Sequence, residues 1–255
     1  QQGMTPITIW KYDEVGHNQE GRQEVKKLFD DNGYFDGPKP VRLLSRILQV
    51  ANTDNDSIVL DFFSGSSTTA HAVMKFNADN QSKRKFIMVQ LPEVCDEGSE
   101  AYKAGYKNIC EIGKERIRRA GDKIKAEAGM MAQDLDVGFR VLKLDDSNMK
   151  EVYYSPDEYS QSLLTQMESN IKDDRTDLDL LFSCLLEWGL PLSLPYTSET
   201  VDGCTIHTYN NGDLIACFNE NVPESVIREI AKRQPLRVVF RDSSFASSPE
   251  KINVE

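Results

Sequence analysis

The chain of 255 residues carries 41 acidic and 30 basic side chains, a net charge of −11, and 39% of its residues are hydrophobic. This length suits one large domain or two modest ones, and the composition is ordinary for a soluble protein. No apolar run approaches the roughly 18–20 residues of a membrane span, so we expect no membrane association.

The acidity is concentrated in the second half. Residues 134–199 hold fourteen acidic and five basic side chains, a net charge of −9. Because DNA-binding surfaces present Lys and Arg to phosphates, this segment is not expected to lie along a DNA backbone. The charge says little about the first half of the chain.

The cysteines stand apart from one another, without a C-x-x-C pair or a nearby histidine cluster; they are Cys95, Cys110, Cys184, Cys204 and Cys217. A zinc site and disulfides are therefore not expected, and no metal is predicted. Free thiols are typical of a reducing compartment, which favours a cytoplasmic location.

The first half alternates helical and strand patterns, as in an α/β fold. In chain order it predicts a strand-like start over 1–12, a helix over 20–29, a Gly/Pro-rich loop over 32–40, a helix from Pro40, a strand over 58–63 with a helix after it, a strand over 85–91, a helix over 109–124 and a strand over 139–144.

The character changes after Asp145, and we place the domain boundary at residue 150, giving domains 1–150 and 151–255. The second domain is predicted to contain helices over 155–171 and 178–186, a hairpin over 201–218 turning at 210–213, a helix over 223–232 capped by Asn221, and a strand over 236–240. This pattern indicates a smaller C-terminal α/β domain.

The most informative stretch is Ser57–Val73, in which an apolar run ends at a Ser/Gly turn followed by a helix-competent segment. Such a strand–turn–helix opens nucleotide-type sites, because the free amides at the helix start attract an anion. The turn has no lysine for a phosphate loop and only Gly65 of the three glycines that a dinucleotide loop needs. S-adenosylmethionine, with one small carboxylate and an adenosine, fits it better.

The segment Asp61-Phe-Phe-Ser-Gly-Ser-Ser-Thr-Thr69 resembles the cofactor loop of amino-methylating DNA methyltransferases. With Ala-His-Ala after it, and with 16–20, 38–40, 86–93 and 115–120 matching in the same order, the chain resembles the Mod subunit of type III restriction–modification systems, over roughly residues 10–150. Ser67 departs from the usual second glycine, which predicts a stiffer loop.

This resemblance implies a partial Rossmann-like core of an S-adenosylmethionine-dependent methyltransferase, followed by the smaller domain. The cofactor-binding residues that it implies are Lys39, Pro40, Asp61, Phe62, Phe63, Gly65, Ser66, Ser67, Thr68, Thr69 and Gln90. Asp61 is expected either to meet the ammonium of the cofactor or only to cap the turn. Gln90 is favoured over Glu93 for the ribose hydroxyls, and the Pro38–Pro40 loop is expected over the methionine end or else is a rigid interhelical loop.

Other residues give weaker signals. His71, in the first turn of its helix, is more often a packed or solvent-facing histidine than a site residue, and the pair Asn18–Gln19 is no stronger. Arg116, Arg118 and Arg119 are candidates for phosphate contact, although a charged helix face is usually only solvated.

Amino-methyltransferases carry an Asp/Asn/Ser-Pro-Pro-aromatic motif that binds the target base. This chain contains no two adjacent prolines, so no catalytic residue is predicted in it. We interpret it as the C-terminal part of a DNA adenine-N6 methyltransferase subunit, inactive alone. The resemblance implies DNA, a second copy of the subunit and an ATP-dependent restriction subunit as partners. The alternatives are a dinucleotide-binding oxidoreductase domain and a non-catalytic interaction protein.

Overall fold

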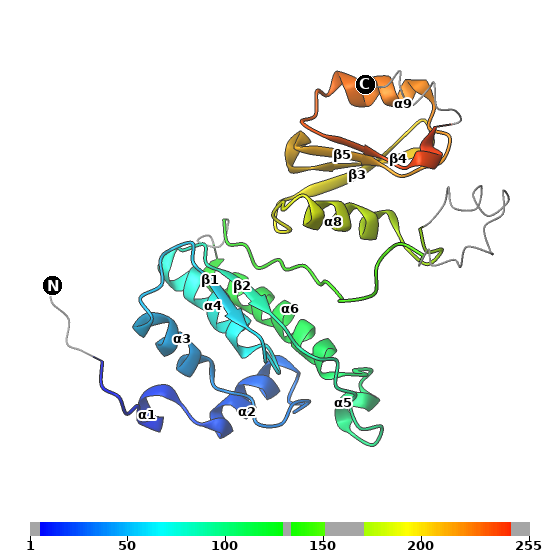
Figure 1. The fold of residues 1–255 in the computed structure, drawn as a ribbon. Coiled ribbons are helices and arrows are strands. Elements are labelled where there is room, and N and C mark those ends of the chain that lie inside the picture. The colour runs from blue at the N-terminus through cyan, green and yellow to red at the C-terminus, as the bar shows by residue number, and fades with distance from the viewer. Residues whose placement is uncertain (1–5, 130–133, 151–170, 246–255) are drawn as a thin grey trace, which may run out of the picture. The chain divides into compact units, whose positions relative to one another are not determined.

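The computed structural model describes residues 6–129, 134–150 and 171–245. The chain divides into two compact units, Gln1–Phe139 and Arg140–Glu255 (Figure 1). None of the helices in these described stretches is both long enough and apolar enough to cross a bilayer.

The first unit is built around two parallel strands joined by a helix. Its elements are α1 (Tyr12–Val15), α2 (Asn18–Leu28), α3 (Val41–Val50), β1 (Ile58–Asp61), α4 (Thr68–Asn80), β2 (Lys85–Met88), α5 (Glu100–Lys103) and α6 (Ile109–Ala128). Strand β1 pairs with β2 from Ile58 opposite Lys85 to Asp61 opposite Met88. Parallel strands need a crossover, and α4 supplies it.

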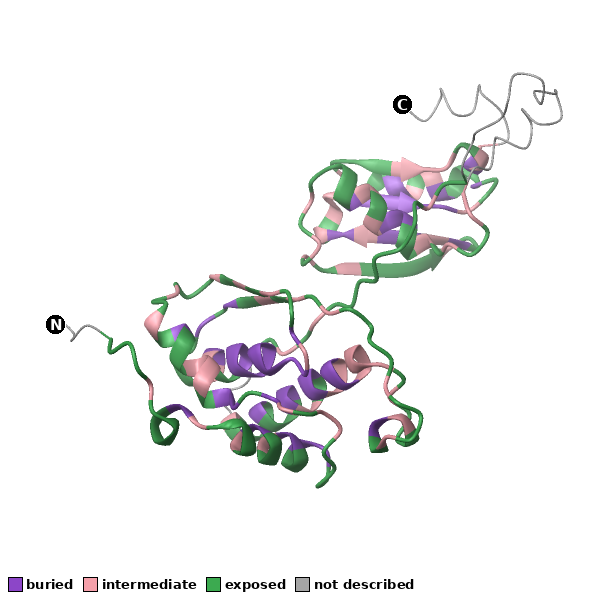
Figure 2. Ribbon diagram, turned by 60° about the horizontal axis from the view of Figure 1, so that its bottom comes forward, coloured by how far each residue is buried: buried purple, intermediate pink, exposed green. Residues whose placement is uncertain are grey.

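Helix α4 is the centre of this unit. Every residue from Thr68 to Met74 is buried, and the helix contacts α3, α6 and β2 (Figure 2). The segment Thr68–Met74 is buried on all sides and so cannot show an amphipathic stripe, whereas Lys75, Asp79 and Asn80 in the second half of the helix are exposed. The cofactor-type turn that precedes α4 is therefore attached to a fully buried helix segment.

The two faces of the β1–β2 sheet differ. Val59 and Phe86 are half-buried against the helices, and Phe86 packs against both apolar clusters of the unit. On the other face Ile58 is 62%, Leu60 57% and Ile87 49% exposed. Parallel strands are usually covered on both faces, so a two-stranded parallel sheet with one apolar face in solvent is unusual.

The second unit has a four-stranded sheet. Its elements are α8 (Asp177–Glu187), β3 (Tyr196–Val201), β4 (Cys204–Tyr209), a 3-10 turn η4 (Asn210–Gly212), β5 (Leu214–Cys217), α9 (Glu224–Lys232), β6 (Val238–Phe240) and a 3-10 turn η5 (Asp242–Ser244). The strand order is β3-β4-β5-β6, with β5 and β6 parallel and the other pairs antiparallel.

Alternation along β5 divides the core of this unit into two. Leu214 and Ala216 join the cluster that includes Leu181 of α8, whereas Ile215 and Cys217 join the cluster that includes Val226 of α9. Successive side chains of a strand point to opposite faces, so α8 and α9 cover opposite faces of the sheet. This explains why β5 is buried at every position.

Several predicted elements are confirmed with small shifts at their ends, including the hairpin of β4 and β5 around Asn210–Gly212. Others are wrong. Residues 6–11 form no strand, and 139–144 form no regular element, with Val141, Leu142 and Leu144 exposed. Pro223, not Asn221, is the N-cap of α9. The helix predicted over 155–171 lies almost wholly outside the described residues. Strand β3 was not predicted, because its alternation is mostly of polar residues.

The turn from α4 into β2 depends on one buried amide. Asn77 Nδ2 donates to the Arg84 carbonyl at 2.8 Å, and Asn77 Oδ1 accepts from Ser82 Oγ at 2.9 Å and from the Arg84 amide at 3.1 Å. We expect Asn77→Ala to lower the free energy of unfolding by about 2–4 kcal/mol, because it leaves buried backbone groups unpaired. Urea titration measures this.

Asn80→Ala is the matched control, since Asn80 makes one exposed bond to the Phe76 carbonyl at the end of the same helix. Its cost should stay below about 1 kcal/mol. Equal losses for the two variants would show that the Asn77 network does not hold this turn.

Candidate functional site

The turn between β1 and α4 is built by two left-handed residues. Gly65 has φ +50° and Ser67 has φ +59°, and α4 begins at Thr68. Gly65 suits this conformation because it has no Cβ, whereas Ser67 adopts it at a cost of about 1–2 kcal/mol. The Ser67 amide donates to the Ser64 carbonyl at 2.7 Å, which closes the turn.

Asp61 lies at the carboxyl end of β1, where its carboxylate spans the turn. Oδ2 accepts from Thr69 Oγ1 at 2.6 Å, and Oδ1 accepts from the Phe63 amide at 3.2 Å. Asp61 therefore caps the turn in this structure. The residue is only half-buried.

Gln90 follows β2 and reaches the same turn. Its Oε1 accepts from the Gly65 amide at 2.7 Å, and its Nε2 donates to the Leu91 carbonyl at 3.2 Å. The carboxyl ends of parallel strands meet at one edge of a sheet, which is where ligands bind in open α/β folds. Glu93, the second candidate, contributes its backbone to the next segment: its carbonyl accepts from the Ile109 amide.

The start of α4 offers unpaired donors. Within the described part of the chain, no acceptor is bonded to the amides of Thr68, Thr69 and Ala70. This is the ordinary condition of a helix N-terminus, and it gives the site a partial positive charge. Beside it Phe62 and Phe63 are 63% and 80% exposed, with ring centroids 5.3 Å apart. A half-buried carboxylate, free amides and exposed aromatic rings suit a zwitterion attached to an adenosine.

Arg116 of α6 holds the turn between β1 and α4 by hydrogen bonds. Its Nη1 donates to Ser66 Oγ and to Thr68 Oγ1, each at 2.7 Å. The guanidinium is fully buried, and its Nε and Nη2 have no partner among the described residues. Burial lowers the pKa of Arg116 to about 10. The expectation that Arg116 contacts phosphate or solvent is wrong, since it lies on the apolar stripe of α6 between Ile112 and Ala120.

Lys39 and Pro40 belong to a loop that is fixed on α2. Gly21 lies so close to this loop that a Cβ there would approach the Pro38 carbonyl oxygen to 2.2 Å. Glu24 Oε2 accepts from the Val41 amide at 2.9 Å, and burial raises the pKa of Glu24. Pro38 and Pro40 are buried and Lys39 is exposed. Direct hydrogen bonds thus join Asp61 to Thr69 and Gln90 to Gly65, while the Lys39 loop is held by α2.

Comparison with known proteins identifies the class. Residues 1–122 match the family described as DNA methylase. The chain is 45% identical to the StyLTI Mod subunit of a type III restriction–modification enzyme from Salmonella typhimurium, over 54% of this chain and 20% of that protein. It is 30% identical to the EcoPI Mod subunit of Escherichia phage P1 and 34% identical to the EcoP15I Mod subunit of Escherichia coli, over 96% and 89% of this chain.

Residues 1–122, just under half of the chain, therefore resemble the DNA methylase family. More particularly, the chain is a relative of the Mod subunits of type III restriction–modification enzymes, which confirms the resemblance that its motifs indicated. It spans 38% of the EcoPI subunit and 34% of the EcoP15I subunit. These matches do not favour an oxidoreductase or a non-catalytic protein.

The positive φ of Ser67 in the turn leads to a prediction about stability. We expect Ser67→Gly to raise the free energy of unfolding by about 1 kcal/mol, because glycine adopts a positive φ without steric cost. Ser45→Gly, inside α3, makes the same chemical change at helical φ and should lower stability by about 0.5–1 kcal/mol;. If chemical denaturation showed losses for both variants, the turn would not be strained at Ser67.

His71 gives a second prediction. It is buried in α4, its Nδ1 has no partner among the described residues, and burial, with Arg116 nearby, lowers its pKa to about 3. Between pH 6.5 and pH 3 the unfolded chain binds a proton at His71 that the folded chain does not. Stability should therefore fall with falling pH, by about 2 kcal/mol from pH 7 to pH 5 through this residue alone.

Urea titrations of the wild type and His71→Gln at pH 7, 6 and 5 isolate this contribution, since other groups titrate alike in both. His71→Gln should gain stability relative to the wild type as the pH falls, because glutamine binds no proton in either state. A constant difference between wild type and His71→Gln across this range would mean that His71 protonates in the folded state.

Proposed function

We propose that the first unit is a partial Rossmann-like core that binds S-adenosylmethionine. The observation that carries this proposal is the convergence of Asp61, Gly65 and Gln90 on the N-terminus of α4, at the carboxyl edge of two parallel strands. The match of residues 1–122 to the DNA methylase family supports it, because a DNA methylase needs a methyl donor.

The residues around the turn each have a separate role in binding the cofactor. The carboxylate of Asp61 accepts from the ammonium, and the amides of Thr68 and Thr69 meet the carboxylate of the methionine moiety. Gln90 uses Oε1 to hold Gly65 and offers the second hydrogen of Nε2 to the ribose. Phe62 and Phe63 provide aromatic surface for the adenosine.

The remaining predicted residues act around this core. Ser66 supports the turn through Arg116, Ser67 shapes it, and Lys39 and Pro40 bring a stiff loop over the methionine end. Proline fixes the backbone of that loop before binding, which lowers the entropic cost of a contact.

The reaction that we propose for the whole subunit is methyl transfer from S-adenosylmethionine to adenine N6 in DNA. The cofactor supplies the electrophilic methyl group, and the protein positions it against a flipped base. We propose DNA, a second copy of the subunit and an ATP-dependent restriction subunit as partners, in the cytoplasm; the relatives, which are Mod subunits of type III restriction–modification enzymes, support a place in such a system. We assign the second unit to protein–protein contact, because residues 134–199 carry most of the acidic excess and repel phosphate.

The cofactor assignment predicts that the chain binds S-adenosylmethionine or its demethylated product in calorimetry, and that NAD does not bind. Asp61→Ala should weaken binding by about 1–3 kcal/mol if the carboxylate accepts from the ammonium. Thr69→Val is the matched control, because it breaks the same bond within the turn but keeps the carboxylate.

A ligand role for Asp61 requires that Asp61→Ala weaken binding much more than Thr69→Val. Equal effects of the two variants would leave Asp61 as a turn cap only. If NAD bound, and neither S-adenosylmethionine nor its demethylated product did, the cofactor assignment itself would be wrong.

The missing Pro-Pro-aromatic motif predicts that these 255 residues alone transfer no methyl group to DNA. The measurement is incorporation of radiolabelled methyl into genomic DNA that lacks adenine methylation, with cofactor binding checked on the same sample. Label above background that disappears in Asp61→Ala would show that a catalytic group lies within this chain.

A further inference from the structure

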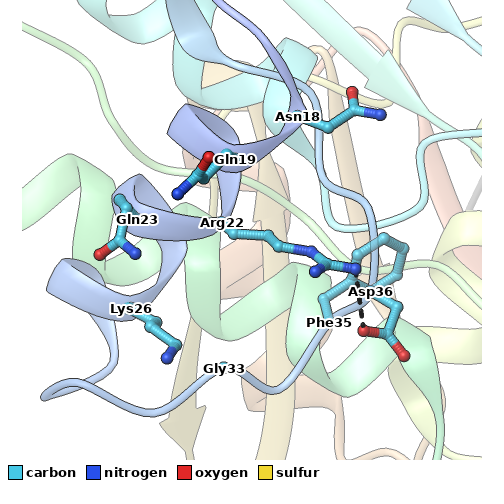
Figure 3. Close-up of a pocket in the computed structure, with 8 residues that line it drawn as sticks. All are labelled: Asn18, Gln19, Arg22, Gln23, Lys26, Gly33, Phe35 and Asp36. Carbon is cyan, nitrogen blue, oxygen red and sulfur yellow. Dashed lines mark ion pairs between the residues drawn. The ribbon is translucent and has the colours of Figure 1, made fainter.

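A polar cavity lies beside α2, apart from the residues assigned to the cofactor. It has a volume of about 610 Å³ and is walled on one side by the loop that contains Gly33, Phe35 and Asp36 (Figure 3). Its other wall is a single face of α2, formed by Asn18, Gln19, Arg22, Gln23 and Lys26. This face presents three amides, a guanidinium and an ammonium, and we call the cavity the α2 groove.

Helix α2 separates its charges between two sides. At 100° per residue, Arg22 and Lys26 lie on the groove side, while Glu20 and Glu24 lie on the opposite side;. Glu20 forms a bidentate pair with Arg42, with both bonds at 2.6 Å, and Glu24 accepts from the Val41 amide. The acids of the helix are thus engaged with α3 and do not neutralise the groove.

Arg22 and Lys26, the two cations of the groove, form at most a weak ion pair with the described residues. Arg22 reaches across to Asp36 at 3.7 Å, a long pair in which the Asp36 side chain is fully exposed (Figure 3). Lys26 lies along Gly33, where its Cε is 3.2 Å from the position of a Cβ, and no acidic group is paired with it in the described residues. Such exposed pairs contribute little and are readily exchanged for a stronger anion.

We propose that the α2 groove binds the phosphodiester backbone of DNA. Arg, Lys, Asn and Gln side chains are the usual donors to phosphate oxygens, and here five of them lie on one helix face in a chain whose net charge is −11;. Amide donors can also contact phosphate without adding charge, so the groove positions a strand and does not depend on base identity.

The groove adjoins the cofactor turn. Phe35, which lines it, lies against Gly65, since a Cβ on Gly65 would be 3.2 Å from Phe35 Cζ. A strand held in the groove would therefore pass close to the turn. This inference rests on the proposed function, because it supplies the DNA contact that methyl transfer to DNA requires.

The experiment measures binding of a fluorescent DNA duplex to the full chain at salt concentrations from 50 to 200 mM. Replacing one phosphate-contacting lysine lowers the slope of log K against log salt by about 0.9. The advantage of the wild type over Lys26→Gln should therefore shrink about 3.5-fold across this range. Arg22→Gln should behave in the same way.

Two variants serve as controls on the same helix and groove. Lys27→Gln removes the same charge from the next residue of α2, which does not line the cavity, and should leave the slope unchanged. Asp36→Asn removes the acid of the groove and should tighten DNA binding. Circular dichroism checks that each variant is folded.

Equal slopes for Lys26→Gln and Lys27→Gln, weaker binding by Asp36→Asn, or no binding of DNA by the wild type would each overturn the proposal. Calorimetry with S-adenosylmethionine on the same proteins separates this result from failure of the proposed function. If DNA binding is absent and cofactor binding is intact, only the proposal for the α2 groove is wrong. If cofactor binding is absent, the methyltransferase assignment is wrong.

Discussion

The first unit depends on a charged side chain placed where water is excluded. Arg116 is fully buried, and its Nη1 donates hydrogen bonds to the hydroxyls of Ser66 and Thr68. Burying a guanidinium with two nitrogens unpaired is costly, so the turn must hold those hydroxyls in place to offset part of that cost. Loop geometry and core packing are thereby coupled: the turn cannot change shape without exposing or unpairing the charge beneath it.

This coupling explains why the site can be both open and ordered. Phe62 and Phe63 are exposed, yet every residue from Ser66 to Met74 is buried. Asp61 and Gln90 tie the turn to the ends of β1 and β2, and Arg116 ties it to α6. A ligand then meets donors and acceptors whose positions are set in advance, which reduces the entropy lost on binding.

The two units are stabilised differently. The second unit covers its sheet on both faces, with α8 on one and α9 on the other. The first unit covers one face of its parallel pair and leaves Ile58, Leu60 and Ile87 exposed on the other. Apolar surface of this kind is normally buried in α/β proteins, whereas the groove of α2 is polar;.

The sequence by itself determined the local elements and the class of site, because periodicity, Gly65 and the Asp61–Thr69 motif act over a few residues. It identified the hairpin at Asn210–Gly212 and the resemblance to type III Mod subunits, which the comparisons confirm. Only the tertiary structure decided that Arg116 is buried, that residues 139–144 pair with no strand, and that α2 turns its cations to a cavity. The physical reason is that burial and partners are set by contacts between residues distant in sequence, as Arg116 and Ser66 are, and no local pattern specifies them.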